Sequence, residues 1–500
     1  MTHPGPAWRL AVLALAAVVV GVAGCVATPT VSPPSSSPSA TPRDFTVGTT
    51  ERVTALDPVA VTDSMSTSVT LALFQRLMTM DEGKVGLRPD AAEDCKYVSP
   101  VQVECSLRTG LTFDNGHALT ASDVKFSINR ALRLGVDGSS ARQLAALSTI
   151  DTLDDHTVRF NLSWADNQFI TALSEPAASI VDEDVYDPDT IRGLADNPVG
   201  SGPFWLSASF TDRLYLRQFR AYKGYNAASS EFVSLRFFTD SAAIEEAMKQ
   251  NQVDVVWRSL NAAALKRLDG QIAGSKDKLT DSGFRRETTV GQRVHFLRWS
   301  DTSPYRLDST LRTTISVALR DQRTLDSILP VGIEGHISAF PLGGVTTLPS
   351  LTGDRPRLTL SYDAQITGDK EMARDLRDRI ESAAGVSVQL VADTPTADLV
   401  LYNYKAWNAT PIAWLQPYRT KALPGSDAKI AEYEKLYRTT TDTTQREIYL
   451  SEMQKQAAVD AMVLPISQDD DDMFLASKVK VHEPKYGPGW QLALWSVGLQ

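Results

Sequence analysis

The stretch that decides the fold is residues 358–391, which read LTLSYDAQITGDKEMARDLRDRIESAAGVSVQLV. Leu358–Tyr362 and Val386–Val391 are runs of strand-forming residues. Between them, Asp369–Ala384 has the apolar spacing of a helix, and Gly385 is placed to end that helix. This order of strand, helix and strand predicts a βαβ unit in a parallel sheet.

The residues around this unit extend it into an α/β lobe. Asp398–Tyr404 predicts a further strand, so we expect residues from about 290 to 465 to form a lobe with a mostly parallel sheet. Ligands of such sheets bind in crevices outside the carboxyl ends of the strands. The segment after Leu401 is therefore the candidate position for a ligand.

Strand and helix signals also alternate in the N-terminal half of the chain. Phe45–Gly48 predicts a strand, and the apolar spacing within Met65–Met80 predicts a helix. Thr120 and Asp123 have the spacing of a capping box, and Asp240 is placed to cap another helix. These signals predict packed elements and not a binding site.

Two cysteines, Cys95 and Cys105, enclose nine residues that predict a hairpin with its turn at Ser99 and Pro100. In an antiparallel hairpin these cysteines are direct cross-strand neighbours within disulfide reach. A disulfide here would fix the local register and contribute about 3 kcal/mol. The alternative is two free buried thiols.

The N-terminal residues have the features of a lipoprotein signal. Arg9 supplies a positive charge, residues 10–20 are almost entirely apolar, and Val22-Ala23-Gly24 leads into Cys25. We expect residues 1–24 to be removed and acyl chains on Cys25 to hold the protein at the outer face of the cell membrane. The alternative is a buried cysteine in a transmembrane anchor, although the apolar run is short for a span.

Composition limits the remaining possibilities. Residues 25–44 are rich in proline, serine and threonine and predict an extended tether. The rest of the chain is long enough for two or three sub-domains. With 50 Lys and Arg against 60 Asp and Glu, the 500-residue chain has a formal net charge of −10. This balance argues against nucleic acid or an anionic membrane surface as the main partner.

Catalytic motifs are sparse in this sequence. Gly200-Ser201-Gly202 lacks the spacing of a nucleophile elbow and is followed by proline, so it predicts a turn. The six histidines form no HExxH pair and have no carboxylate at ligand spacing. Asp469–Asp472 either gathers calcium or is a solvated acidic loop. The sequence therefore predicts a protein that is not an enzyme and needs no cofactor or metal.

One long motif is specific. Leu107–Phe113 followed by Asn115–Val124 resembles LRxGxxFxxGxxLTAxDV, the pattern of the extracellular solute-binding proteins of family 5. This family contains the peptide-, oligopeptide- and nickel-binding lipoproteins that serve ABC transporters. Further similarities to family patterns lie at Asn197–Phe204, Tyr222–Tyr225, Gln252–Asp254 and Leu311–Asp321.

The resemblance implies an α/β fold of the periplasmic-binding-protein class, type II. Such a fold is a two-lobed clamp with mixed sheets and helices, and its interlobe cleft closes on a ligand by hinge motion. Residues 45–285 are expected to form lobe 1, to which residues 466–500 return. Residues 286–465 are expected to form lobe 2.

The resemblance also implies a function. It predicts a monomeric substrate-binding lipoprotein of an ABC importer that delivers a small solute, peptide-like, saccharide or other, to a permease. The alternative is an envelope lipoprotein of the same fold with a regulatory or scaffolding role and no transport. A ligand that raises the melting temperature favours the first interpretation, and an empty cleft with a stable protein partner favours the second.

The sequence departs from the peptide binders of the family at one position. Those proteins have a pattern like WxADYxDP, in which the aspartate meets the ammonium group of the peptide. When Ala406 and Pro411 are aligned with this pattern, Trp407 replaces that aspartate. An indole suits a sugar ring, an aromatic group or a cation-π contact; the alternative is that Trp407 packs between the lobes. The candidate ligand-binding residues are Trp407, Asn408, Tyr404, Asn403, Trp257 and Ser66.

Overall fold

The computed structural model describes residues 45–80, 86–344, 347, 351, 356–364, 368–406, 410–482 and 491–499, without the side chains of residues 289, 290, 292 and 293. These residues belong to one compact unit. The predicted signal peptide, the tether, Cys25 and the candidate residues Trp407 and Asn408 lie outside the described residues. Within the described ranges, no helix is both long and apolar enough to cross a membrane.

Strands and helices are interspersed along the described chain. The strands are β1 (Phe45–Thr49), β2 (Met78–Met80), β3 (Leu87–Pro89), β4 (Ala92–Ser99), β5 (Gln102–Leu107), β6 (Leu147–Asp154), β7 (Thr157–Leu162), β8 (Phe204–Phe210), β9 (Arg213–Gln218), β10 (Phe232–Phe237), β11 (Val255–Trp257), β12 (Phe284–Trp299), β13 (Arg357–Tyr362), β14 (Ser387–Ala392), β15 (Leu399–Tyr404), β16 (Val463–Ala476), β17 (Val479–Val481) and β18 (Val497–Leu499). The α-helices are α1 (Ser64–Leu73), α2 (Ala121–Leu134), α3 (Phe169–Ala172), α4 (Ser241–Lys249), α5 (Ala262–Gly274), α6 (Ser309–Ala318), α7 (Asp369–Ala384), α8 (Pro411–Arg419), α9 (Asp427–Thr439) and α10 (Thr443–Asp460), and the short 3-10 helices are η1 (Pro58–Ala60), η2 (Ser140–Leu144) and η3 (Pro176–Ala178).

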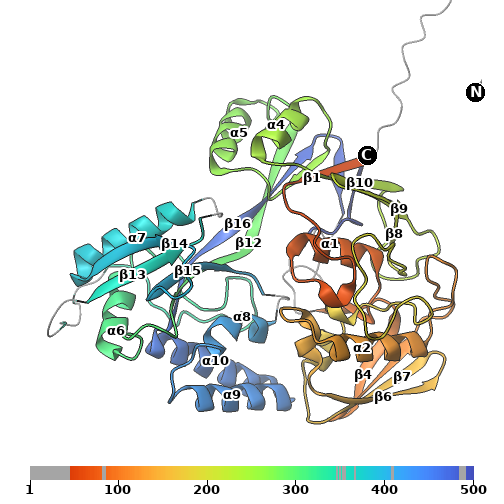
Figure 1. The fold of residues 1–500 in the computed structure, drawn as a ribbon, viewed down its shortest axis with the longest axis horizontal. Coiled ribbons are helices and arrows are strands. Elements are labelled where there is room, and N and C mark those ends of the chain that lie inside the picture. Colours follow the sequence, from red (N-terminus) through yellow and green to blue (C-terminus); the bar gives the residue numbers. More distant parts are fainter. Residues whose placement is uncertain are drawn as a thin grey trace, which may run out of the picture. The chain divides into compact units, whose positions relative to one another are not determined.

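A ten-stranded sheet runs through the fold in the order β14-β13-β15-β12-β16-β11-β1-β10-β9-β8 (Figure 1). Its central strands β12 and β16 are long and antiparallel. We call the part with β13–β15 and α6–α10 the second lobe, and the part with β1, β4–β11 and α1–α5 the first lobe. The predicted lobe boundaries at residues 285 and 465 fall inside β12 and β16. We propose that the hinge between the lobes lies at these boundaries.

The βαβ unit predicted at residues 358–391 is present in the second lobe. β13 pairs in parallel with both β14 and β15, and α7 packs on β13 and β14 (Figure 1). Gly385 has a φ of +66° and ends α7, as expected. The sheet of this lobe is mostly parallel, as expected, but β12 is antiparallel to its neighbour β15. The chain enters this lobe along β12 against the direction of the parallel strands, so the sheet is mixed.

The first lobe contains a separate four-stranded antiparallel sheet, β4-β5-β7-β6, which shares an apolar core with α2. Its register places Cys95 opposite Cys105, and these two cysteines form a disulfide. The hairpin prediction is therefore confirmed. The capping box of Thr120 and Asp123 on α2 and the cap of Asp240 on α4 are also present.

The helix predicted over Met65–Met80 is shorter in the structure. α1 ends at Leu73, and the last three residues of the predicted helix form strand β2. The carbonyl of Leu73 accepts a hydrogen bond from the backbone N–H of Gly202 at 2.9 Å and so does not continue the helix. A Cβ on Gly202 would lie 2.5 Å from the carbonyl carbon of Leu73, which explains the glycine at this close approach.

Candidate ligand-binding cleft

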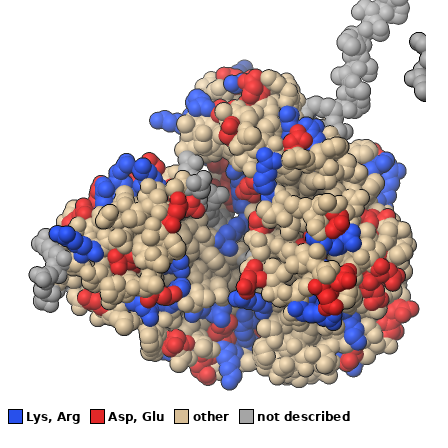
Figure 2. Space-filling view, viewed as in Figure 1, with Lys and Arg blue, Asp and Glu red and all other residues tan. Residues whose placement is uncertain are grey.

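A cavity of about 580 Å³ lies where the two lobes meet. Its first-lobe wall comes from η2 and the loop after β7, and its second-lobe wall comes from α8 and α9. Figure 2 shows a furrow between the lobes, with Lys and Arg side chains gathered towards its lower end. The charged and aromatic residues that line the cavity are Arg142, Trp164, Asp166, Tyr404, Arg419, Glu434, Lys435 and Arg438.

Two further hollows continue from this cavity, one after the other, through shared lining residues. The smaller one, of about 140 Å³, is lined by Glu51, Ser64, Arg258, Asn403, Tyr404 and Lys405. Tyr404 lines both this hollow and the large cavity, so the two share a wall. The other hollow, of about 960 Å³, opens around Arg258 and Asp469–Asp472. Together the three hollows form the candidate cleft.

Asn403 and Tyr404 lie at the carboxyl end of β15 and line the cleft, where the strand-end argument places a ligand. The Tyr404 hydroxyl donates to the carbonyl of Ala413 at 2.7 Å, and the Tyr404 ring meets Trp414 edge-on with centroids 5.6 Å apart. Burial raises the pKa of Tyr404 above its ordinary value. Because its hydroxyl is already engaged, Tyr404 offers a ligand its ring.

Trp257 and Ser66 do not reach the cleft, so the structure corrects their expected contact with a ligand. Both side chains are fully buried. Trp257 belongs to the main apolar core, and the Ser66 hydroxyl accepts a hydrogen bond from the backbone N–H of Thr54 at 2.9 Å. Arg258 and Ser64 line the cleft instead.

Arg258 is held firmly at the centre of the cleft. Its φ of +48° lies in the left-handed region that few residues other than glycine adopt. Its guanidinium lies 4.2 Å from the centroid of the Trp257 ring and forms an ion pair with Asp471. The side chains of Arg258 and Asp471 are only 6% and 4% exposed. Arg258 is therefore a fixed wall of the cleft.

The acidic run Asp469–Asp472 is part of strand β16, so the expectation of a solvated loop is wrong. Asp471 pairs with Arg258, and Asp472 pairs with Arg286 at 2.7 Å. These two arginines occupy two of the four carboxylates that could supply oxygen ligands to a calcium ion. The run therefore serves the packing of the central strands.

His295 is a buried histidine on β12 between two carboxylates. Its Nε2 lies 3.3 Å from Asp369, and its Nδ1 lies 3.4 Å from Asp469. Burial lowers the pKa of His295, but the hydrogen bonds that it donates to these carboxylates and their negative charges outweigh the burial and raise the pKa to about 9. Asn403 donates to the same Asp369 at 3.3 Å. The imidazolium thus helps to order a residue that lines the cleft.

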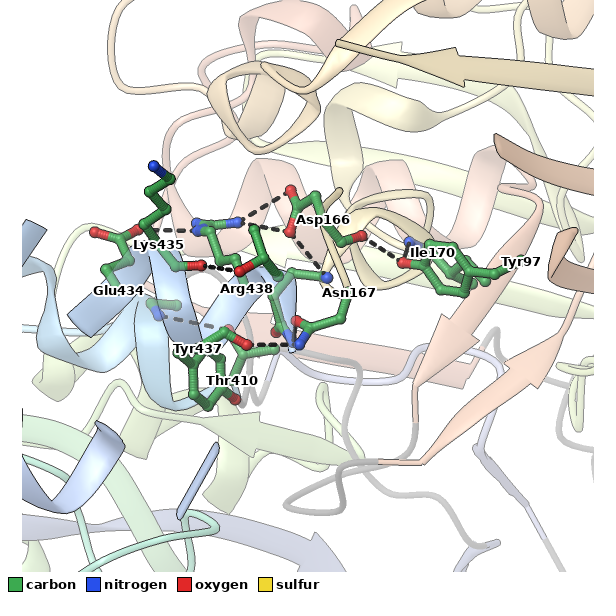
Figure 3. A network of polar contacts seen from close by, with 12 residues as sticks. Tyr97, Asp166, Asn167, Ile170, Thr410, Glu434, Lys435, Tyr437 and Arg438 are labelled. Carbon is green, nitrogen blue, oxygen red and sulfur yellow. Dashed lines mark hydrogen bonds and ion pairs between the residues drawn. The ribbon is translucent and has the colours of Figure 1, made fainter. Parts of the chain in front are cut away.

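A set of polar contacts joins the lobes beside the large cavity (Figure 3). We call it the interlobe clasp; it comprises Asp166 and Asn167 of the first lobe and Tyr437, Arg438 and Thr440 of the second. Nη1 of Arg438 lies 3.2 Å from both carboxylate oxygens of Asp166. Nδ2 of Asn167 donates to the carbonyls of Tyr437 at 2.6 Å and Thr440 at 2.9 Å. Asn167 therefore satisfies carbonyls at the end of α9 from the opposite lobe.

The charges at the clasp are paired in a row. Arg438 pairs with Glu434 at 2.9 Å as well as with Asp166, and Glu434 also pairs with Arg419. The Asp166 side chain is 3% exposed. The Tyr97 hydroxyl donates to the backbone carbonyl of Asp166 at 2.6 Å and supports its loop. When the lobes are in contact, each of these four charges therefore has a partner of opposite sign. A buried charge without a partner would be costly.

Sequence reasoning missed the clasp. Asp166 and Arg438 are 272 residues apart, and no local pattern connects them. One usable signal was the short run Trp164–Asn167, in which an aromatic and two polar residues lie shortly after the alternating strand β7. Such a run at the end of a strand is typical of a functional loop.

A possible metal-binding cluster lies elsewhere in the first lobe. Ligand atoms of His117, Asp182 and Asp184 lie within 4.8 Å of one another. Asp182 already accepts hydrogen bonds from His117 at 2.8 Å and from Asn115 at 2.7 Å. None of these residues lines the cleft, and we assign the cluster no function.

Comparison with known families identifies the class of the protein. The model of bacterial extracellular solute-binding proteins, family 5 Middle, matches residues 86–344, which is more than half of the chain. The chain therefore belongs to this family, as the motif at residues 107–124 predicts. Members of the family bind solutes and are not enzymes, in agreement with the lack of a catalytic motif.

Individual relatives agree with this assignment. The chain is 31% identical to the probable D,D-dipeptide-binding periplasmic protein DdpA of Escherichia coli over 229 residues, which are 43% of this chain and 44% of DdpA. The chain thus matches less than half the length of that relative. The dipeptide binding protein of Pseudoalteromonas sp. in complex with Met-Leu has a TM-score of 0.73 at 15% identity and covers 92% of this chain and 100% of its own. AgaA of A. tumefacien in complex with agropinic acid has a TM-score of 0.71 at 18% identity, and the match covers 91% of this chain and 98% of AgaA. These structures confirm the two-lobed type II fold.

Proposed function

We propose that this protein is the substrate-binding lipoprotein of an ABC importer, which captures a small solute between its lobes and delivers it to a permease. The observation that carries the proposal is the cavity of about 580 Å³ at the meeting of two lobes that the long strands β12 and β16 connect. A cavity of this size is in the range of small-molecule sites. Two lobes around such a cavity can close by hinge motion without covalent chemistry.

The ligand that we propose is a small polar solute, peptide-like or saccharide. DdpA is named for D,D-dipeptides, and two solved relatives hold Met-Leu and agropinic acid. In this chain Trp407 replaces the aspartate that meets the peptide ammonium group in the peptide binders. A buried ammonium group without a counter-charge loses its hydration without compensation, so we expect simple peptides to bind weakly. We propose Trp407, Asn408, Asn403 and Tyr404 as ligand contacts from the second lobe.

The attachment to the membrane is part of the same proposal. We propose that Cys25 carries the lipid anchor and that residues 26–44 act as a tether, which lets a monomeric body reach the permease. The composition of residues 1–44 supports this arrangement, because the apolar run ends at a cysteine and is followed by a segment with little apolar bulk.

Native mass spectrometry of freshly purified protein tests the proposed function. We expect a co-purified small molecule at one copy per chain, and that molecule should raise the melting temperature when it is added back. A chain that carries no small molecule and co-purifies instead with a stable protein partner would favour the regulatory or scaffolding alternative.

A further inference from the structure

The large cavity has an imbalance of charge. It is lined by four cationic side chains but by only two carboxylates. The cations are Arg142, Arg419, Lys435 and Arg438, and the carboxylates are Asp166 and Glu434. A cleft with excess positive charge favours an occupant with negative charge, because its low-dielectric walls strengthen the electric field inside it.

The paired row at the clasp identifies which cations are in excess. Arg419 pairs with Glu434, and Arg438 pairs with both Glu434 and Asp166. These two arginines and two carboxylates neutralise one another. Arg142 and Lys435 remain, one on each lobe.

Lys435 has a free amino group. Within the described part of the chain that group forms no ion pair and no hydrogen bond, and Figure 3 shows it pointing away from the Arg438–Asp166 pair. Arg142 pairs with Asp137 at 2.6 Å, but their side chains are 76% and 92% exposed. An exposed pair of this kind contributes little, so a ligand can replace it at small cost. Asp137 does not line the cavity.

An aromatic side chain lies in the same cavity. Trp164 is 47% exposed, whereas Trp257, Trp299 and Trp414 are fully buried. Its indole offers the flat apolar surface on which a ring or an acyl group packs. The cavity thus combines an apolar wall with two cations that are available to a ligand.

We propose that the solute of this cleft is a small organic anion, whose negative group is held by Arg142 and Lys435 and whose flat or apolar part packs on Trp164. This inference rests on the proposed binding function and specifies the charge class of the ligand. Arg142 lies on the first lobe and Lys435 on the second, so an anion that contacts both links the lobes. The negative charge of the ligand then favours closure as well as binding.

The test uses a pool of N-acetylated dipeptides as free acids and the same pool as C-terminal amides, so that the members of each pair differ only in charge. Native mass spectrometry identifies the retained members, and calorimetry measures their dissociation constants. We expect the acids to bind about tenfold or more tightly than the amides, the effect of one charge-assisted hydrogen bond. Lys435→Gln and Arg142→Gln should each reduce this preference by a similar factor. Lys429→Gln on the same helix and Arg133→Gln, which do not line the cavity, should leave it unchanged.

The outcomes separate this inference from the proposed function. Amides that bind as tightly as acids, or a preference for acids that survives both substitutions, overturns the anion inference. If amides or saccharides are retained while acids are not, the proposed function stands and the anion inference fails. If neither pool and no co-purified solute is retained, both fail.

Discussion

Asn167 is the residue of the interlobe clasp whose removal is most informative. Its side-chain amide donates two hydrogen bonds across the lobes, to the carbonyls of Tyr437 at 2.6 Å and Thr440 at 2.9 Å. Each such bond contributes about 0.5 to 1.5 kcal/mol net, so Asn167→Ala should remove about 1 to 3 kcal/mol from the closed conformation. The ratio of closed to open molecules should then fall by about 5- to 150-fold.

Two measurements report this change. Small-angle X-ray scattering should show a larger radius of gyration for Asn167→Ala than for the wild type. Calorimetry with the co-purified molecule should show weaker binding, because the binding-competent closed state is less populated. The weakening should appear mainly as faster dissociation, since changes within one interface mostly alter the dissociation rate.

Asn161→Ala is the matched control. The Asn161 amide also donates two hydrogen bonds, to Thr149 at 3.0 Å and Asp151 at 2.8 Å, but both partners are on the neighbouring strand of the same lobe. This variant should resemble the wild type in radius of gyration and in affinity. The reasoning is refuted if Asn167→Ala and Asn161→Ala give the same scattering curve and the same dissociation constant.

Four further predictions concern other parts of the chain. Cys25→Ser should move the protein from the membrane fraction to the soluble fraction; a variant that still sediments with membranes contradicts the lipoprotein proposal. Peptide mapping without reductant should recover the segments of Cys95 and Cys105 as one linked species, and thiols that titrate at both positions would contradict the disulfide. Trp407→Ala should weaken the true ligand by about 1 to 3 kcal/mol in calorimetry, and an unchanged affinity would place this indole outside the site. The folded-state pKa of His295, about 9, is above the ordinary 6.5, so its stabilising contribution of up to about 3 kcal/mol is complete below pH 6.5 and lost as the pH rises through 9. Urea unfolding of wild type and His295→Gln between pH 6 and 10 should show that only the wild type loses this contribution.

Local patterns predicted the parts of the fold that local contacts determine. The βαβ unit, the capping box of Thr120 and the hairpin of Cys95 and Cys105 each depend on residues close in sequence. The end of α1 was not predictable in this way. It depends on Gly202, which is far along the chain and takes the carbonyl of Leu73 as its hydrogen-bond acceptor.

The cleft shows the same limit. Asn403 was predictable because the end of a parallel strand is a general position for ligands. The choice of Trp257 was wrong by one residue, since its side chain packs in the core and the neighbouring Arg258 lines the cleft. The clasp between Asp166 and Arg438 joins two lobes, and only the folded arrangement of both lobes brings it together.

The charges around the large cavity divide into two groups with different consequences. Arg438 is paired with Asp166 across the lobes, so removing Arg438 leaves the buried Asp166 carboxylate without its cation and disfavours closure. Lys435 is on the same helix as Arg438 but has no such partner within the described residues, so its removal costs the closed protein little. A change at Arg438 should therefore weaken every ligand to the same extent, whereas a change at Lys435 should weaken acids and spare amides. Closure and charge selectivity are carried by different side chains of one helix, α9, and single substitutions can separate them.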